Sequence, residues 1–176
     1  MQKDLSQVIY RKLINGHVIN KRVMRDGFLQ ASPLFQELAL EVNREHYEHL
    51  YEMIGYELKQ LDDCFFLNEI GKDEVLSETA MRVQAILLVL LRGITQIPLL
   101  SDILLDDAAG LNREHIKTIE DNEEFQQILK AVGLKGHLSR EIDNLLVSRY
   151  IAYWNPLDKL VLSDGGKALW ATMQGL

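Results

Sequence analysis

The sequence predicts a mainly α-helical protein that carries two small β-hairpins. Apolar residues recur at helical spacing in both halves of the 176-residue chain. In each half this spacing gives way to a short alternation of apolar and polar residues around a turn. Only three prolines interrupt the chain, so short turns must join the elements. A hydrophobic share of 47% is that of a globular protein, and we expect a real core.

The first half of the chain begins with three predicted helices, over residues 4–13, 33–43 and 44–54. Ser32 followed by Pro33 is a helix start, because the serine can cap the helix and a proline at the first position loses no hydrogen bond. The residues expected to face inward on the second and third helices are Leu34, Phe35, Leu38, Val42, Tyr47, Leu50, Tyr51 and Ile54.

A β-hairpin is predicted directly after these helices. Residues 56–61 alternate in polarity, Asp62-Asp63 can form a tight turn, and residues 64–67 return as an apolar strand. Phe66 lies in this return strand, and we expect it to face the core. Replacement of Phe66 by aspartate is therefore expected to disrupt folding, because an unpaired buried carboxylate is costly.

The second half repeats this order of elements. Ser77, Glu78 and Thr79 mark the start of the most apolar predicted helix, over residues 78–93. This helix should be central, because it is apolar on nearly every side. A hairpin is expected over 150–162, around a turn at 155–158. The other predicted helices cover residues 123–132, 138–149 and 164 or 165 to 173.

In both halves of the chain, predicted helices are followed by a two-stranded wing. This is the element order of tandem winged-helix domains. The predicted fold class is therefore mainly α with small β-hairpin wings, arranged as tandem winged-helix domains. Residues 71–73 look like the joint between the halves. We expect an N-terminal winged-helix-like domain over 1–73 and a C-terminal winged-helix domain over 74–176.

The charge of the chain works against direct attraction to nucleic acid. It holds 26 acidic and 19 basic residues, a net charge of -7, whereas a nucleic-acid binder normally presents a basic face. The outward side of the helix over 44–54 includes Glu45, Glu48 and Glu52, and these carboxylates would be repelled by phosphates. DNA contact is expected to be indirect or weak.

The location expected for the chain is the cytoplasm, with no membrane contact. Cys64 is the single cysteine and cannot form an internal disulfide, and residues 1–20 lack the unbroken apolar core of a signal peptide. The most apolar stretch, residues 83–91, is much shorter than a membrane span requires.

No group of residues predicts catalysis, a cofactor or a metal site. His46 and His49 lie three apart among glutamates, but a zinc-protease helix needs His-Glu-x-x-His, and a solvated helix face explains them better. Cys64 has no CxxC partner and is expected to be a buried structural thiol. Gly165-Gly166 lacks the Walker spacing. The paired aspartates at 62–63 and 106–107 suit turns.

The elements taken together resemble the MukE/MksE-type subunits of bacterial condensins. The resemblance covers almost the whole chain and rests on apolar spacings and wings. In the first half it is carried by Phe35 to Leu38, Leu40, Tyr47, Tyr51, Gly55-Tyr56-Glu57-Leu58 and Phe65-Phe66-Leu67. In the second half it is carried by Thr79 to Leu91, Leu138 to Tyr153 and Leu160-Val161-Leu162.

This resemblance implies a non-catalytic, nucleoid-associated subunit of a condensin-like SMC complex. Such a subunit would be a homodimer of tandem winged-helix protomers that binds the kleisin and, through it, an SMC ATPase. Its role would lie in chromosome organisation or DNA defence.

The resemblance also implies a set of partner-binding residues. In the first half, Leu34, Phe35, Tyr47, Tyr51 and Phe66 would divide between the core and dimer contacts. In the second half, Tyr153, Trp154 and Trp170 would offer the kleisin-binding surface. The charges of Glu141 and Asp143, which would be repelled by phosphates, separately predict that these residues bind protein. Independently of the resemblance, Arg149, Lys159 and Lys167 could cluster close to the second wing and lie near DNA, although a solvated basic rim is the favoured interpretation of these residues.

Two other classes of function stay open. A winged-helix transcriptional regulator that binds DNA as a homodimer would share the fold, and steep salt dependence of DNA binding by the purified protein would favour it. An enzyme of unknown type would depend on the His46 and His49 pair, which metal analysis tests.

Overall fold

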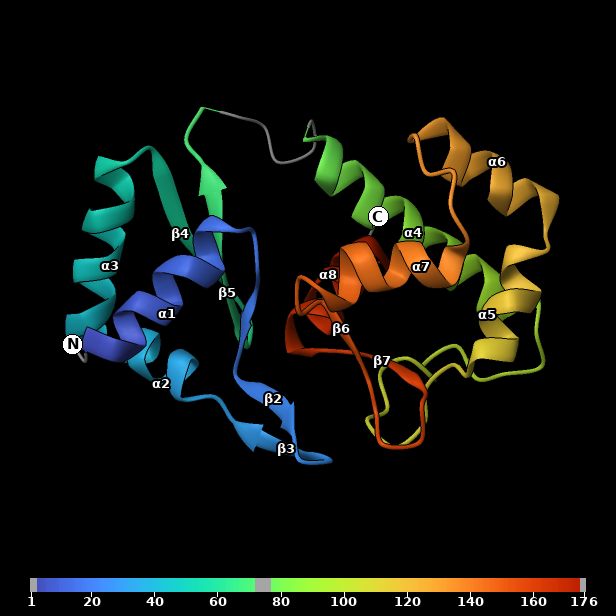
Figure 1. Ribbon diagram of the computed structural model, residues 1–176, viewed down its shortest axis with the longest axis horizontal. Helices are drawn as coiled ribbons and strands as arrows, with labels where there is room; N and C mark the ends of the chain where they lie inside the picture. The colour runs from blue at the N-terminus through green and yellow to red at the C-terminus, as the bar shows by residue number, and fades with distance from the viewer. Residues whose placement is uncertain (1–2, 72–76, 175–176) are drawn as a thin grey trace. The chain divides into compact units, whose positions relative to one another are not determined.

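The computed structural model describes residues 3–71 and 77–174, which form two compact units (Figure 1). Unit 1 is built from residues 1–74, 149–151 and 163–176, and unit 2 from residues 75–148 and 152–162. Both units are mainly helical, and their sheets are small and antiparallel. The expected class, mainly α with small hairpins, is confirmed.

Unit 1 combines helices with a three-stranded sheet of order β1-β5-β4 and a separate β2-β3 hairpin. Its elements are α1 (Lys3–Ile14), β1 (Ile19–Asn20), β2 (Arg22–Arg25), β3 (Phe28–Ala31), α2 (Pro33–Ala39), α3 (Glu41–Met53), β4 (Tyr56–Leu61), β5 (Cys64–Glu69) and α8 (Asp164–Gln174). Its main core is made of Ile9, Leu13, Ile19, Leu34, Phe35, Leu38, Tyr47, Tyr51, Leu58 and Phe65.

The boundary between helices α2 and α3 lies earlier in the chain than predicted. Ser32 caps α2 as expected, accepting a hydrogen bond from the N–H of Phe35, but α2 ends at Ala39 because Leu40 is extended (φ -70°, ψ 118°). Val42 therefore lies in α3, where Tyr47 and Tyr51 fix the inward side. The prediction that Val42 faces inward is wrong. Leu50 and Ile54, also expected inside, are exposed too.

The first predicted hairpin is confirmed, including its turn at Asp62-Asp63. In the antiparallel pairing of β4 with β5, Phe65 lies opposite Gln60 and Phe66 lies opposite Lys59. Side chains alternate between the two faces of a strand, so only one of the two phenylalanines can face the core. That residue is Phe65, which is 1% exposed, whereas Phe66 is half-buried. The expectation that Phe66 faces the core is corrected accordingly.

The described residues of unit 2 form four α-helices, a π-helical turn and a hairpin. Its elements are α4 (Glu78–Thr95), α5 (Arg113–Glu120), α6 (Glu123–Ala131), α7 (Leu138–Ile142), the π-helical turn η2 (Asp143–Val147), β6 (Ala152–Trp154) and β7 (Leu160–Leu162). Ser77 caps α4 through the N–H of Ala80, as predicted. Gly93 allows α5 to approach α4 closely, because a Cβ at this position would lie 2.6 Å from the side chain of Ile119.

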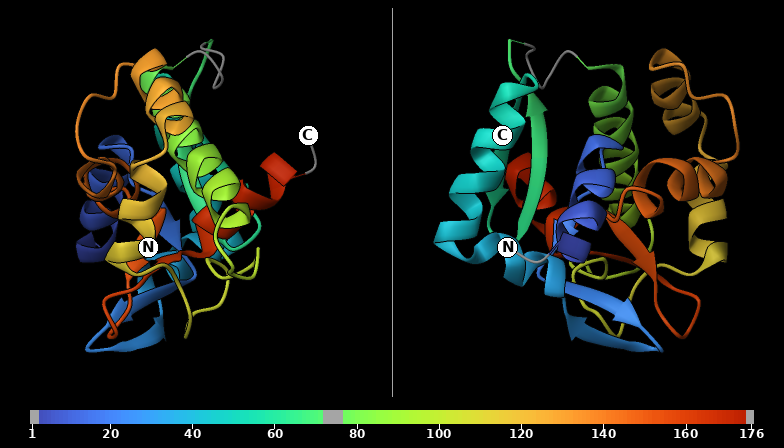
Figure 2. Two further views of the ribbon diagram at one scale, coloured as in Figure 1. Left: turned by 90° about the vertical axis from the view of Figure 1, so that its right-hand side faces the viewer. Right: turned by 60° about the vertical axis from the view of Figure 1, so that its left-hand side comes forward.

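The C-terminal helix α8 completes unit 1. It lies against β1 and β5, beside β5 in the right-hand view of Figure 2. The buried amide of Asn20 accepts a hydrogen bond from Gly165 N (2.7 Å) and donates one to Tyr150 O (2.7 Å). Asp164 accepts three hydrogen bonds from Arg22, one from the backbone N–H and two from the guanidinium.

This division of the chain differs from two sequence-continuous domains, because α8 and residues 149–151 pack with the N-terminal residues. The proposed domain limits, 1–73 and 74–176, stay a prediction. Among the described residues, no helix is both long enough and apolar enough to cross a membrane.

The different burial of Phe65 and Phe66 gives a first testable prediction. Phe65→Ala should lower the free energy of unfolding by about 3–5 kcal/mol, the usual cost of emptying a buried aromatic site. Phe66→Ala should cost clearly less, because its ring already contacts solvent. Urea denaturation of both variants measures the difference. Equal losses would contradict the assignment of the two strand faces.

A second prediction concerns Asn20. Asn20→Ala leaves Gly165 N and Tyr150 O without their partner and should lower the free energy of unfolding by about 2 kcal/mol or more. The control is Gln127→Ala, at an exposed position of α6, which should change stability by less than about 0.5 kcal/mol. Chemical denaturation of the two variants gives the comparison, and an unaltered midpoint for Asn20→Ala would contradict the role of this amide.

Candidate protein-binding surfaces

The outer face of α3 carries exposed apolar side chains next to an acidic edge. Val42 and Met53 are 69% and 73% exposed, and Leu50 is 44% exposed. At about 100° per residue, Val42 and Met53 lie within about 20° of each other around the helix. The neighbouring edge holds Glu41, Glu45, Glu48 and Glu52, all exposed. Within the described residues, none of these four glutamates has an ion-pair partner.

Large exposed apolar side chains that gather on one helix face are typical of an interaction surface. This surface could not be predicted from the sequence, because Val42 and Leu50 have the helical spacing that is typical of inward residues. The break at Leu40 and the two buried tyrosines, Tyr47 and Tyr51, decide which side of α3 is inside. The exposure of Glu45, Glu48 and Glu52, in contrast, was expected, whereas Glu41 was placed in the preceding helix and joins this edge because α3 begins at Glu41.

A second surface is formed by the β6-β7 hairpin of unit 2. The ring of Trp154 is half-buried, and its Nε1 donates a hydrogen bond to Asp143 (2.7 Å). The guanidinium of Arg113 lies over this ring, 4.2 Å from the centroid, and also pairs with Asp158. Hydrogen bonds from Arg113 lower the pKa of Asp158. Leu157 is 67% exposed at the turn between the strands.

Glu141 and Asp143, predicted to bind protein, are both half-buried and bonded within unit 2. Glu141 accepts a hydrogen bond from Gly136 N (3.1 Å), and Asp143 accepts the one from Trp154. Tyr153, a further predicted contact, is half-buried and donates its hydroxyl hydrogen to Asp107 (3.1 Å). Substitution of these residues would therefore alter the packing of unit 2 as well as any partner surface.

The other predicted contact residues lie mostly in cores. Their exposed fractions are 9% for Leu34, 8% for Phe35, 1% for Tyr47, 0% for Tyr51 and 1% for Trp170. With so little exposure, these side chains are core residues. A partner role for any of them stays a prediction.

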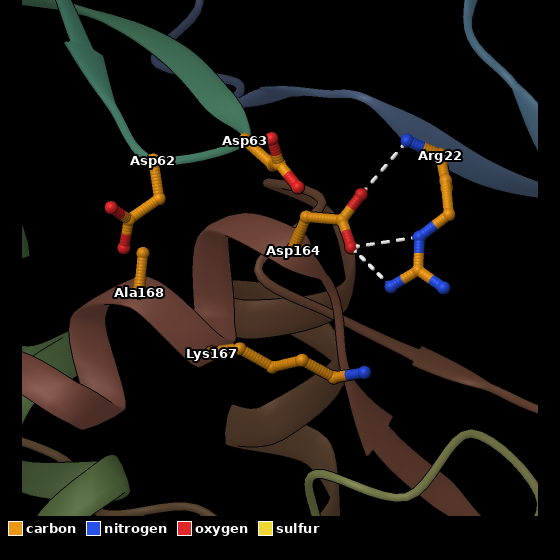
Figure 3. Close-up of a pocket in the computed structure, with 6 residues that line it drawn as sticks. All are labelled: Arg22, Asp62, Asp63, Asp164, Lys167 and Ala168. Atoms are coloured by element: carbon orange, nitrogen blue, oxygen red, sulfur yellow. Dashed lines mark hydrogen bonds and ion pairs between the residues drawn. The ribbon is translucent and has the colours of Figure 1, made fainter.

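The three predicted DNA-proximal cations have different surroundings. Arg149, in unit 1, donates to Gly16 O (3.3 Å). Burial, together with the positive charges of Lys12 and Arg149, lowers the pKa of His17. Lys159 lies in unit 2, next to strand β7. Lys167 lines a polar pocket of unit 1 (Figure 3).

This polar pocket is organised by an ion pair. Figure 3 shows the Asp164 carboxylate facing the backbone N–H and guanidinium of Arg22, with Asp62, Asp63 and Lys167 around them. The Asp164 side chain is 5% exposed, so its charge requires the three hydrogen bonds that it accepts. These bonds attach the start of α8 to Arg22 of β2, which gives the pocket a structural explanation.

The residues considered as candidates for catalysis or metal binding are explained by structural roles. Cys64 is buried, its thiol donates to Leu61 O, and burial raises its pKa to about 12, so it is a poor nucleophile. His46 is exposed, with Nδ1 2.6 Å from Val42 O. In the described part of the chain, no three His, Cys, Asp or Glu residues come together in a way that could hold a metal ion.

The fold and surfaces thus define a two-unit helical protein with faces suited to other proteins. The comparison with protein families matches the condensin complex protein MksE over residues 4–148, which is most of the chain. The chain therefore belongs to the MksE family and is a subunit of a condensin-like complex, as the resemblance implied. Searches of curated proteins and of solved structures gave no match.

The raised pKa of Cys64 gives a third prediction. The native thiol holds its proton up to a pKa of about 12, whereas an unfolded thiol ionises near its ordinary pKa of 9.0. The contribution of this group to stability is therefore complete below about pH 9 and is lost as the pH rises toward 12. Cys64→Ala should show a smaller loss of stability between pH 8 and pH 10.5 than the unmodified chain. Denaturation at the two pH values gives the comparison, and identical losses would contradict it.

Proposed function

We propose that this chain is a non-catalytic, kleisin-binding subunit of an SMC complex, built from two winged-helix domains. The observation that carries the proposal is the family match, which spans residues in both units. The element order supports the winged-helix assignment. Helices α2 and α3 precede the β4-β5 hairpin, and α7 with η2 precedes β6-β7.

In this proposal the chain acts in the cytoplasm, at the nucleoid, as a homodimer. It binds the kleisin subunit and, through it, an SMC ATPase, in chromosome organisation or DNA defence. The β6-β7 hairpin is the proposed kleisin contact, because Trp154 and the exposed Leu157 place apolar surface beside the charged pair of Arg113 and Asp158. An aromatic and apolar centre with a polar rim is the usual composition of a protein interface.

The acidic surface of α3 is the main physical argument that DNA contact is indirect. In a winged-helix regulator, a helix that precedes the wing would enter the major groove. The four exposed glutamates of α3 would be repelled by phosphates. The regulator alternative would require the cations of unit 1, such as Lys12 and Arg149, to outweigh this edge. Duplex-DNA binding by the purified chain at physiological salt would favour that alternative.

The kleisin contact can be tested with Leu157→Asp. A carboxylate placed on the apolar turn should weaken capture of the kleisin encoded in the same genome by about tenfold or more, the effect of losing an interface residue worth more than about 1 kcal/mol. The control is Leu100→Asp, because Leu100 is another highly exposed leucine (77%) of unit 2. Both variants should melt like the unmodified chain.

Co-purification with quantitative titration gives the measurement. Equal kleisin capture by Leu157→Asp and the unmodified chain would remove the hairpin from the interface. Absence of capture by the unmodified chain would overturn the proposed function as a whole.

A further inference from the structure

The exposed stripe of α3 has the spacing of a seam that packs against another helix. Val42, His46, His49 and Met53 follow one another at intervals of four, three and four residues, and all are exposed. This is the spacing by which side chains of one helix pack into another in helix pairs. The seam occupies almost the full length of the 13-residue helix, about 20 Å at 1.5 Å per residue.

The two edges of this seam differ in chemistry. Glu41, Glu45, Glu48 and Glu52 line one edge, also at intervals of four, three and four residues. The other edge is apolar and holds Leu50 and Ile54, which are 44% and 45% exposed. Arg44, which is the one Lys or Arg of α3, is half-buried and donates to the carbonyls of Leu38 and Ala39, so it does not neutralise the glutamates.

We infer that α3 binds an amphipathic helix of another protein subunit, with the apolar side of that helix on the seam and a row of Lys or Arg along the glutamates. Charge complementarity selects this occupant. Nucleic acid and anionic lipid would both be repelled by the acidic edge. A partner helix with a basic row would neutralise it and would be held in one orientation, because only one edge of the seam is charged.

A second copy of this chain is a poor occupant of α3. If two α3 helices packed antiparallel about a two-fold axis, both acidic edges would lie on the same side and repel each other. If they packed parallel, each acidic edge would meet Leu50 and Ile54 of the other copy. Neither arrangement places a cation opposite a glutamate. The inference rests on the proposed function only in taking the partner to be another subunit of the complex.

The experiment uses two designed 18-residue helical peptides, one of leucine and lysine and one of leucine and glutamate with the same apolar pattern. Fluorescence anisotropy with the full chain should show binding of the lysine peptide, weaker binding at higher salt, and no binding of the glutamate peptide. Glu45→Gln with Glu48→Gln should weaken lysine-peptide binding by about fivefold, since two solvent-exposed charge pairs are removed.

Two further variants distinguish docking on α3 from general charge attraction. Glu114→Gln with Glu123→Gln removes the same charge from exposed positions of unit 2 and should leave the affinity within about twofold, a difference too small for a lost contact. Val42→Ser with Met53→Ser keeps every charge and should weaken binding by about fivefold or more. Thermal melts should show all three double variants folded.

Equal weakening by the two glutamine pairs, or unchanged binding after the two serine substitutions, would overturn the inference. The measurement does not involve the kleisin, so failure of kleisin capture bears on the proposed function alone. Peptide binding still decides whether α3 is a docking surface.

Discussion

The amide side chain of Asn20 is the contact on which the architecture of unit 1 depends. It is 3% exposed, and it pairs through its oxygen with the first turn of α8 and through its nitrogen with Tyr150. Its own strand, β1, pairs with β5. One side chain thus joins the sheet to two segments more than 120 residues later in the chain. Gly165 is required at this point, because a Cβ there would lie 2.7 Å from Val18 and 3.0 Å from the Asn20 oxygen.

Much of the helical framework could be predicted from the sequence, because it depends on local signals. Capping by Ser32 and Ser77 and the apolar spacing of α4 and α6 are properties of a few neighbouring residues. The β2-β3 hairpin was not predicted, although its turn is an Asp-Gly pair, because its strands have only four residues each and their apolar residues stand side by side instead of alternating with polar ones. Helix α5 was missed as well, although Asn112 caps it.

The candidate surfaces were harder to predict, because exposure depends on contacts between distant parts of the chain. Three glutamates of the acidic edge of α3 could be predicted from helical spacing, but the place of Glu41 on that edge and the exposure of Val42 depend on the extended backbone of Leu40. Glu141 and Asp143 were expected on an outward face. Their bonds to Gly136 and Trp154 involve a loop and a strand that no helical pattern specifies. The positions of the acidic residues can be read from the sequence, but tertiary contacts determine which of their side chains are free to bind a partner.

The position of α8 in unit 1 also has a consequence for synthesis on the ribosome. The N-terminal elements of unit 1 are made first, but Asp164 and Gly165, which they bind, appear only after residues 75–163 have been translated. At roughly 5–20 residues per second, this interval lasts on the order of 5–20 s. Most of unit 2 emerges during that time with its own core residues complete. We therefore expect unit 2 to fold first, and the nascent N-terminal segment to remain incomplete and in need of protection until translation ends.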